Sequence, residues 1–484
     1  MNISTRHGVA LRALTVAAAL TLLGACKDGF IPDQNNPGQD DFSVITSRSQ
    51  LQAVASGLLA GDRFFWADRW ILFSETIARN VIRFDPAEPR FITRLIRGET
   101  AAGGPGSAMS TSDFIGGANW GTLYANVRSA DLMIAAVDAS ENATPTPLTA
   151  AEKSAAKGFA KTMKAMALLR VVESRDVLGA VVDPADPSQP LPDIKCKTAA
   201  LAAVISVLND AAADLAAGGT DFPFVMPASF GPAQTVAGFL QFNKALLAKA
   251  ETYRAFINYT PANPTIDQAA LARAEAAINA SFYSLTAPTT LGVYHSFSTA
   301  SGDTPNPLND NSVYRINPLV AAAADPNDAR RSKWVIGVNR TGGTASTTPA
   351  TNTAIASNLV QNVHLSPSQP IAIIRNAELI LLRAIIEWGQ NDDVAALINL
   401  NRVRTVEGGL APIAVSHAAL PAAILHEVRL SLLFESSASW VYTRMLGLLN
   451  TLNPTPATHP NPLTAFPIPQ GERDARSNEF ACTP

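Results

Sequence analysis

The sequence predicts a mostly α-helical fold of stacked helical hairpins, with long irregular loops and few short strands. Two observations support this prediction. Apolar residues return every three or four positions in most ordered segments, as on the buried face of an amphipathic helix. These segments also come in pairs that are rich in alanine and joined by short turns. Two long stretches without this periodicity separate the pairs and supply the predicted loops.

The helical pattern can be followed along the chain. In one segment Phe159, Met163 and Met166 share a side, and another segment ends before Gly218-Gly219, a typical helix stop. Paired helices of this kind stack in the manner of tetratricopeptide repeats, although the strict consensus of those repeats is absent. The predicted helices span residues 51–59, 120–134, 153–172, 198–217, 235–259, 266–282, 371–388 and 392–406, and a final pair spans 421–449.

Residues 61–117 and 284–370 are predicted as irregular loops. Compact domains rarely contain loops of this length unless the loops serve a function. The second stretch is rich in Thr, Ser, Asn and Gly, and a short strand such as 334–338 fits within it. We therefore expect a ligand-binding surface to be built from these two stretches.

The first residues have the pattern of a bacterial export signal. Arg6 and Arg12 give a basic start, and the apolar run 13–23 is shorter than the roughly 20 residues that span a bilayer. Leu23-Gly24-Ala25-Cys26 then resembles the bacterial lipobox, in which the cysteine is acylated and becomes the new N-terminus. The alternative is an ordinary signal peptide with a chance cysteine. We expect a signal peptide over 1–25, a lipid on Cys26, a flexible polar tether over 26–41, and one domain over 42–484 with halves at about 42–282 and 283–484.

The composition excludes several classes of function. Charged residues make up 16% of the chain and the formal net charge is −3, so no basic surface for nucleic acid is expected. Hydrophobic residues make up 47%, which predicts a folded core. The six histidines lack metal-ligand spacing, and neither a GxSxG motif nor a P-loop is present. We therefore expect no catalytic residues, no metal site and no cofactor.

Two cysteines remain besides Cys26, namely Cys196 and Cys482. An oxidising exterior would permit a disulfide between them. Two free thiols are the alternative, because a sequence does not give the distance between two cysteines. Both possibilities stay open at the level of the sequence.

Three motifs in the second half of the chain point to a known family. Ile374-Arg375-Asn376-Ala377-Glu378-Leu379 is similar to the pattern IRLAEL, Leu400-Asn401-Arg402-Val403-Arg404 to LN.VR, and Phe466-Pro467-Ile468-Pro469 to FPIP. Together with Trp120 and Tyr124 in an early helix and with the lipobox, they resemble the SusD/RagB family of outer-membrane lipoproteins. The resemblance covers nearly the whole mature chain and implies a helical fold.

One motif region departs from the family pattern. The usual ER..EL.FEG sequence is kept at Glu427, Phe434 and Glu435, but Ser436 stands where the family has glycine. This indicates a divergent member. Carboxylates in these motifs, for example Glu378 with Arg402 or Arg404, are interpreted as structural ion pairs between stacked helices rather than as catalytic groups.

The resemblance also implies a location, a ligand and a partner. It places the lipid in the outer membrane with the protein facing the cell exterior. It implies capture of an oligosaccharide, or of a peptide, and its delivery to a SusC-like TonB-dependent transporter. The low charge favours a neutral glycan. Two alternatives are a lipid-anchored, tetratricopeptide-like scaffold without a small-ligand site, and a secreted hydrolase with convergent acids or a nucleophile and its base.

Aromatic residues in the two loop stretches are the predicted ligand contacts, because flat rings pack against the apolar faces of sugars. Large aromatic residues are more often buried, so a core position is favoured for the cluster 64–66 over a role in ligand binding. The first three of the following candidates are expected to be exposed: Trp70, Tyr294, Tyr314, Trp66 and Tyr283.

Overall fold

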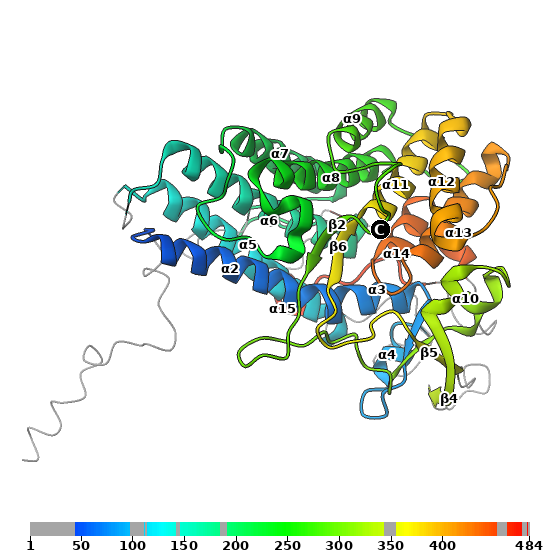
Figure 1. Cartoon of the computed structure of the whole chain (residues 1–484). Coiled ribbons are helices and arrows are strands. Elements are labelled where there is room, and N and C mark those ends of the chain that lie inside the picture. The colour runs from blue at the N-terminus through cyan, green and yellow to red at the C-terminus, as the bar shows by residue number, and fades with distance from the viewer. Residues whose placement is uncertain are drawn as a thin grey trace, which may run out of the picture. The chain divides into compact units, whose positions relative to one another are not determined.

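The computed structural model describes residues 44–96, 111, 114–141, 146–183, 191–342, 355–452, 462–476 and 482. The predicted signal peptide, Cys26 and the tether lie outside these residues, and the lipid anchor stays a prediction. Ile45–Pro484 forms one compact unit by itself. Its described residues are mostly helical with few short strands (Figure 1), which confirms the predicted fold class. The division into halves near residue 282 stays a prediction.

Five long helices form a stack in which each helix packs against the next: α5 (Phe114–Asp138), α6 (Ala150–Arg175), α7 (Lys197–Ala216), α8 (Val236–Ala255) and α9 (Gln268–Asn279). The helix α2 (Arg48–Phe65) packs on α5. A capping box between Thr149 and Glu152 starts α6. Gly158 lets α6 and α7 approach closely, because a Cβ atom there would lie 2.6 Å from Leu215.

The helix α7 has an unusually apolar sequence. Among the residues that the structure describes, it is the one helix long and apolar enough to cross a membrane. Leu201, Val204, Leu208 and Leu215 are buried where α7 packs between α6 and α8. Its apolar sequence is thus explained by its place inside the stack.

A second group of helices follows: α11 (Asn376–Gly389), α12 (Asp393–Gly408), α13 (Leu420–Ser431) and α14 (Ala438–Met445). The helix α11 packs against α12, α13 and α9. The predicted helix 371–388 is wrong in its first five residues, because Ile371–Arg375 forms the strand β6. All five residues are buried, so the run lacks the two-residue alternation that identifies a half-exposed strand. Its three β-branched isoleucines favour the extended backbone.

The final predicted pair, 421–449, is interrupted between α13 and α14. Phe434 has a φ of +59°, a left-handed conformation that is incompatible with a continuing helix. Its N–H donates to Glu75 Oε2 at 3.0 Å, and its carbonyl accepts from His364 Nε2 at 2.8 Å. These two bonds hold the connection in place. Glu75 belongs to α3 (Leu72–Ile77), which packs against α14.

Two small antiparallel sheets form within the predicted loops. The first has the strand order β1 (Val81–Arg83), β3 (Tyr314–Ile316), β5 (Ile355–Gln361) and β4 (Trp334–Gly342). In the second, β2 (Gly292–His295) pairs with β6 and so lies beside the start of α11. The predicted strand 334–338 is therefore present within β4. Short elements complete the description: α4 (Arg90–Thr93), η3 (Asp176–Leu178), η4 (Ala228–Gln234), α10 (Pro318–Ala323), η5 (Ala329–Lys333), η7 (His417–Ala419), η8 (Leu449–Thr451) and α15 (Gln470–Ala475).

The predicted loop 61–117 is wrong over its first part. The helix α2 continues to Phe65, and a π-helix η2 (Trp66–Ile71) leads directly into α3. Gly61 lies inside α2, and a Cβ atom there would meet the side chain of Asn126 on α5 at 2.7 Å. This glycine therefore serves the packing of two helices and does not end one.

A disulfide joins Cys196, at the N-terminus of α7, to Cys482. The two cysteines lie 286 positions apart in the sequence. The chain before Cys482 also contacts the helical stack, since the N–H of Phe466 donates to the carbonyl of Ser174 at the end of α6. The structure therefore favours the disulfide over two free thiols.

Candidate functional site

A pocket, called the α2 pocket below, opens between α2, η4 and the end of β2. Its residues on α2 are Ser56, the adjacent pair Leu59 and Ala60, and Arg63, which recur every three or four positions and so share one face of that helix. The cavity volume is about 260 Å³, slightly below the roughly 300–1,000 Å³ of most small-molecule sites. It therefore suits a small group or the end of a longer ligand. The lining residues are Ser56, Leu59, Ala60, Arg63, Pro227, Ser229, Phe230, His295 and Ser296.

Arg63 connects the rim of the α2 pocket to the loop after β2. Its guanidinium donates to the carbonyl of Ser296 at 2.9 Å and pairs with Asp303 at 2.7 Å. It also lies 5.7 Å from the centre of the Phe297 ring. A hydrogen bond from the N–H of Thr304, together with Arg63, lowers the pKa of Asp303, so this carboxylate is ionised at neutral pH. The Arg63 side chain is partly exposed and can bind hydroxyl oxygens of a ligand.

Phe64 follows Arg63 on α2 and is 63% exposed. Exposed aromatic side chains of this size are unusual, because burying a large ring stabilises the fold. The favoured core position of the cluster 64–66 is therefore wrong for Phe64 and confirmed for Phe65 and Trp66, which are buried. Phe64 offers an exposed flat apolar surface next to Arg63 in the sequence, outside the lining of the α2 pocket.

A buried charge cluster lies at the base of the α2 pocket. The Nε2 atom of His295 lies 2.6 Å from Oδ2 of Asp62, and Arg170 of α6 binds the other oxygen. Burial raises the pKa of Asp62, but the charge of Arg170 and the bond from His295 outweigh it and the pKa is lowered. Burial lowers the pKa of His295 more than Asp62 raises it. A neutral imidazole thus donates to an ionised carboxylate, and the base of the pocket is fixed.

This cluster predicts a dependence of stability on pH. Because the pKa of His295 is lower in the fold, the unfolded chain binds the proton more readily below about pH 6.5, and acid removes stability. The free energy of unfolding should fall between about pH 7 and pH 5. Replacing His295 with glutamine, which keeps an N–H donor for Asp62, should make this fall smaller by up to about 2 kcal/mol. Urea unfolding at both pH values measures the difference. An identical pH dependence in the two proteins would contradict the prediction.

Other histidine and carboxyl groups, among them His364 and Glu75, titrate in both proteins and cancel in that comparison. Burial lowers the pKa of His364 to about 4, so this residue, like His295, makes the folded protein less stable in acid. Burial raises the pKa of Glu75 to about 7, which has the opposite sign, because the folded protein then holds this proton more tightly than the unfolded chain. The variant must therefore be compared with the unmodified protein at each pH.

The prediction that Trp70 is exposed is wrong. Trp70 lies on η2 with 0% of its surface exposed, and its ring centre lies 6.1 Å from that of Phe65 and 5.9 Å from that of Trp440. Trp66, on the same π-helix, is also buried, and its indole N–H donates to the carbonyl of Ala372 at 2.7 Å. Both residues belong to a helix that continues into the core, where a loop was predicted.

Tyr314 is likewise buried, and the prediction that it is exposed is wrong. It lies on β3, which pairs with β1 at one edge and with β5 at the other. Its ring meets that of Phe434 edge-on at 5.4 Å. Tyr283 and Tyr294 are half-buried and do not line the α2 pocket. The hydroxyl of Tyr283 donates to Asn399 Oδ1 at 2.7 Å, and that of Tyr294 donates to the carbonyl of Thr290 at 2.5 Å. Both tyrosines are partly exposed and stay predicted ligand contacts outside this pocket.

The α2 pocket contains residues that were not predicted from the sequence, above all Arg63 and Phe230. The signal for Arg63 is its position on a helix that also contains Ser56 and Ala60 at helical spacing. Ending the predicted helix before Gly61 removed this signal. The approach of Phe230 to His295, with ring centres 6.4 Å apart, joins segments far apart in the chain and has no local signature.

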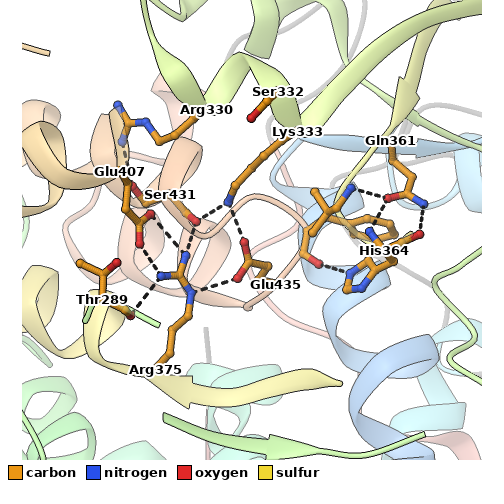
Figure 2. A network of polar contacts seen from close by, with 12 residues as sticks. Thr289, Arg330, Ser332, Lys333, Gln361, His364, Arg375, Glu407, Ser431 and Glu435 are labelled. Carbon is orange, nitrogen blue, oxygen red and sulfur yellow. Dashed lines mark hydrogen bonds and ion pairs between the residues drawn. The ribbon is translucent and has the colours of Figure 1, made fainter. Parts of the chain in front are cut away.

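The motif residues form a polar network and not a ligand surface. Figure 2 shows Arg375 between Glu407 and Glu435, with Lys333 reaching the same Glu435. The predicted pairing of Glu378 with Arg402 or Arg404 is wrong. Glu378 pairs with Lys249 at 2.9 Å, and Arg404 pairs with Glu427 at 3.1 Å. Within the described residues, no three His, Cys, Asp or Glu side chains are placed to hold a metal ion.

Solved structures share this arrangement of helices over nearly the whole chain. A SusD-like carbohydrate-binding protein from Bacteroides fragilis NCTC 9343 matches with a TM-score of 0.64 at 14% identity, covering 90% of this chain and 99% of that one. A SusD superfamily protein from Parabacteroides distasonis ATCC 8503 matches with a TM-score of 0.63 at 14% identity, covering 90% and 98%. This chain has the SusD fold. No family model and no curated protein matches its sequence.

The SusD fold confirms the resemblance that the motifs suggested. A further SusD superfamily protein, from Bacteroides thetaiotaomicron VPI-5482, gives a TM-score of 0.62 at 15% identity and covers 89% of this chain and 98% of that one. In this SusD-fold chain, the motif with Arg375 and Glu378 lies at the junction of β6 and α11, and the motif with Glu435 lies between α13 and α14. The motifs therefore mark contacts that maintain the fold.

Proposed function

We propose that this protein is a non-catalytic, cell-surface nutrient-binding lipoprotein that delivers an oligosaccharide to a SusC-like TonB-dependent outer-membrane transporter. The SusD fold supports the proposal, since one solved structure of this fold is described as a carbohydrate-binding protein. The lipobox at Cys26 and the polar sequence up to residue 41 support a tethered position on the outer membrane, facing the exterior. A neutral glycan fits the low content of charged residues.

The rim of the α2 pocket is the observation that carries the ligand assignment. It includes the partly exposed guanidinium of Arg63, and the next residue on α2, Phe64, has a ring that is 63% exposed outside the pocket lining. A sugar offers hydroxyl oxygens to the first and an apolar C–H face to the second. The hydroxyl of Ser229 is buried and has no hydrogen-bond partner among the described residues, so it is available to a ligand group that enters the pocket.

Replacing Arg63 with alanine should weaken oligosaccharide binding by about tenfold, the effect of losing a charge-assisted hydrogen bond of about 1.5 kcal/mol. A glycan array identifies a bound oligosaccharide, and calorimetry with that glycan measures the change. Arg48→Ala is the matched control, because Arg48 lies at the other end of α2 and pairs with Glu152 on α6. Unchanged affinity in Arg63→Ala would place the ligand elsewhere.

The partner and the anchor are tested separately from the ligand. The tagged protein, extracted from its own cells, should co-purify with a large TonB-dependent barrel, and replacing Cys26 with serine should release it from the membrane fraction. A lipid-anchored scaffold would instead co-purify with other envelope proteins and leave the glycan array silent. A hydrolase would shorten the bound oligosaccharides, which mass spectrometry of the recovered glycans detects.

A further inference from the structure

We propose that a second pocket, separate from the α2 pocket, binds a neutral saccharide. It lies where the chain after α8, the turn between α11 and α12, and the start of α13 meet, and it is called the Trp388 pocket below. Its cavity volume is about 630 Å³, within the roughly 300–1,000 Å³ of small-molecule sites. It shares no lining residue with the α2 pocket, so the proposal goes beyond the function proposed above.

Trp388 and His417 line the Trp388 pocket and belong to a stack of three rings, whose third member, Phe256, is buried behind them. The rings of Phe256 and Trp388 are nearly parallel, at 8°, with centres 6.0 Å apart, and the imidazole of His417 stacks on Trp388 at 5.5 Å and 25°. The indole N–H of Trp388 donates to the backbone carbonyl of His417 at 3.1 Å. The ring Nδ1 of His417 lies 2.7 Å from Oδ1 of Asp393. Because His417 is held on both sides, its ring is fixed before any ligand arrives. Its side chain is 46% exposed, so the ring is open to a ligand.

A second aromatic surface comes from Tyr259. Its ring stands at 88° to that of Trp388, with centres 5.7 Å apart, and is half-buried. Tyr259 and His417 thus present two ring surfaces to one cavity. The apolar C–H face of a pyranose packs against such rings, and rigid rings lose little entropy when they bind. Pro261 and Ile266 add further apolar surface to the same cavity.

The polar groups of the pocket suit hydroxyls. The side chain of Gln268 donates to the carbonyl of Gly389 at 2.9 Å, which fixes the amide and leaves its oxygen for a ligand. In the described part of the chain, neither the hydroxyl of Tyr259 nor the side-chain amide of Asn391 makes a hydrogen bond. These groups offer both donors and acceptors, which a sugar hydroxyl needs.

The residues that line the Trp388 pocket favour an uncharged ligand over an ionic one. None of the described residues that line the Trp388 pocket is Lys, Arg, Asp or Glu. A phosphate or carboxylate ligand would need a cation or several backbone N–H donors, because removing a charge from water is costly. Rings, prolines and neutral amides together favour an uncharged, hydroxyl-rich ring compound.

The test uses three neutral saccharides, maltotriose, cellotriose and N,N′-diacetylchitobiose, each at about 5 mM, where millimolar sites fill. Saturation-transfer NMR measures binding to the full mature chain. The chain contains the Arg63→Ala substitution, which weakens binding at the α2 pocket. We expect at least one saccharide to bind. Adding Tyr259→Ala or His417→Ala should weaken that binding about fivefold to tenfold, the effect of losing one ring contact.

A third variant guards against a loss of folding. Asn391 has a φ of +63°, a left-handed conformation that glycine adopts freely, so Asn391→Gly removes the amide while keeping the backbone. It should keep the thermal unfolding midpoint and weaken saccharide binding. The proposal is overturned if none of the three saccharides binds, if the ring and Asn391 variants bind as tightly as their parent, or if a triproline peptide binds and the saccharides do not. Because every variant contains Arg63→Ala, any remaining binding at the α2 pocket is the same in all of them, and the change caused by the added substitution reports on the Trp388 pocket.

Discussion

Replacing Lys249 with methionine should lower the free energy of unfolding by about 3 to 5 kcal/mol, the effect of leaving buried charges without their partner. The Nζ atom of Lys249 lies 2.9 Å from Glu378 Oε1 and 3.5 Å from Glu173 Oε1, and all three side chains are buried. Burial lowers the pKa of Lys249, but the two carboxylates outweigh it and the pKa is raised. Methionine matches the apolar part of lysine out to Cε and lacks the ammonium group.

The effect is large because Lys249 joins helices that are far apart in the sequence. It belongs to α8, while Glu173 belongs to α6 and Glu378 to α11. The hydroxyl of Tyr253 donates to Glu173 at 2.7 Å, and that of Tyr442 donates to Glu378 at 3.1 Å. Without the cation, these neutral donors are left to stabilise two carboxylates in a medium of low dielectric constant.

Urea unfolding followed by circular dichroism measures the change, with Lys244→Met as the matched control. Lys244 lies on the same helix, is half-buried, and has no ion pair among the described residues. Equal losses in the two variants would show that the buried pairs contribute little to stability.

The helical part of the fold could be predicted from the sequence because its signal is local. The apolar side of α6 repeats within one helix, and Gly218-Gly219 follows the end of α7. The prediction failed where the local signal was ambiguous. All five residues of β6 are buried, and pairing with β2, some eighty positions earlier, makes them a strand. A pattern of apolar residues does not include that partner.

The candidate site was harder to predict for the same reason. The α2 pocket is built from residues 56–63, 227–230 and 295–296, which only the tertiary fold brings together. The aromatic composition of the loops suggested ligand contacts, but Trp70 and Tyr314 pack in the interior, while Phe64 is exposed. Residue type alone does not separate these cases, because a ring gains free energy from burial in either place. The motif residues were found easily, and they maintain the fold.

Arg375 is the motif residue with the most partners, and replacing it with methionine should cost about 3 to 5 kcal/mol of stability. Its guanidinium binds Glu407 at 2.5 Å and Glu435 at 2.9 Å, and donates to the carbonyl of Ser431 at 2.5 Å (Figure 2). These partners lie on α12, in the connection between α13 and α14, and at the end of α13, so one side chain joins β6 to three further segments. Arg375→Lys should recover part of the loss, because lysine keeps the charge but lacks the planar fork of donors.

The loss in Arg375→Met should also depend on pH. Burial raises the pKa of Glu435, but the charges of Arg375 and Lys333 outweigh it and lower the pKa to about 2. A carboxyl whose pKa is lowered by folding contributes stability above its ordinary value of about 4.5, and this contribution is lost as the pH falls toward 2. The gap between the unmodified protein and Arg375→Met should therefore narrow in acid.

Urea unfolding at about pH 7 and about pH 4 tests both statements. Arg90→Met is the control, because Arg90 is 47% exposed, pairs with its neighbour Glu88, and should cost less than about 1 kcal/mol. A loss in Arg375→Met as small as that of the control, or a gap that stays constant with pH, would contradict this account. If both expectations hold, the arginine of this motif stabilises the fold by closing the junction of four segments.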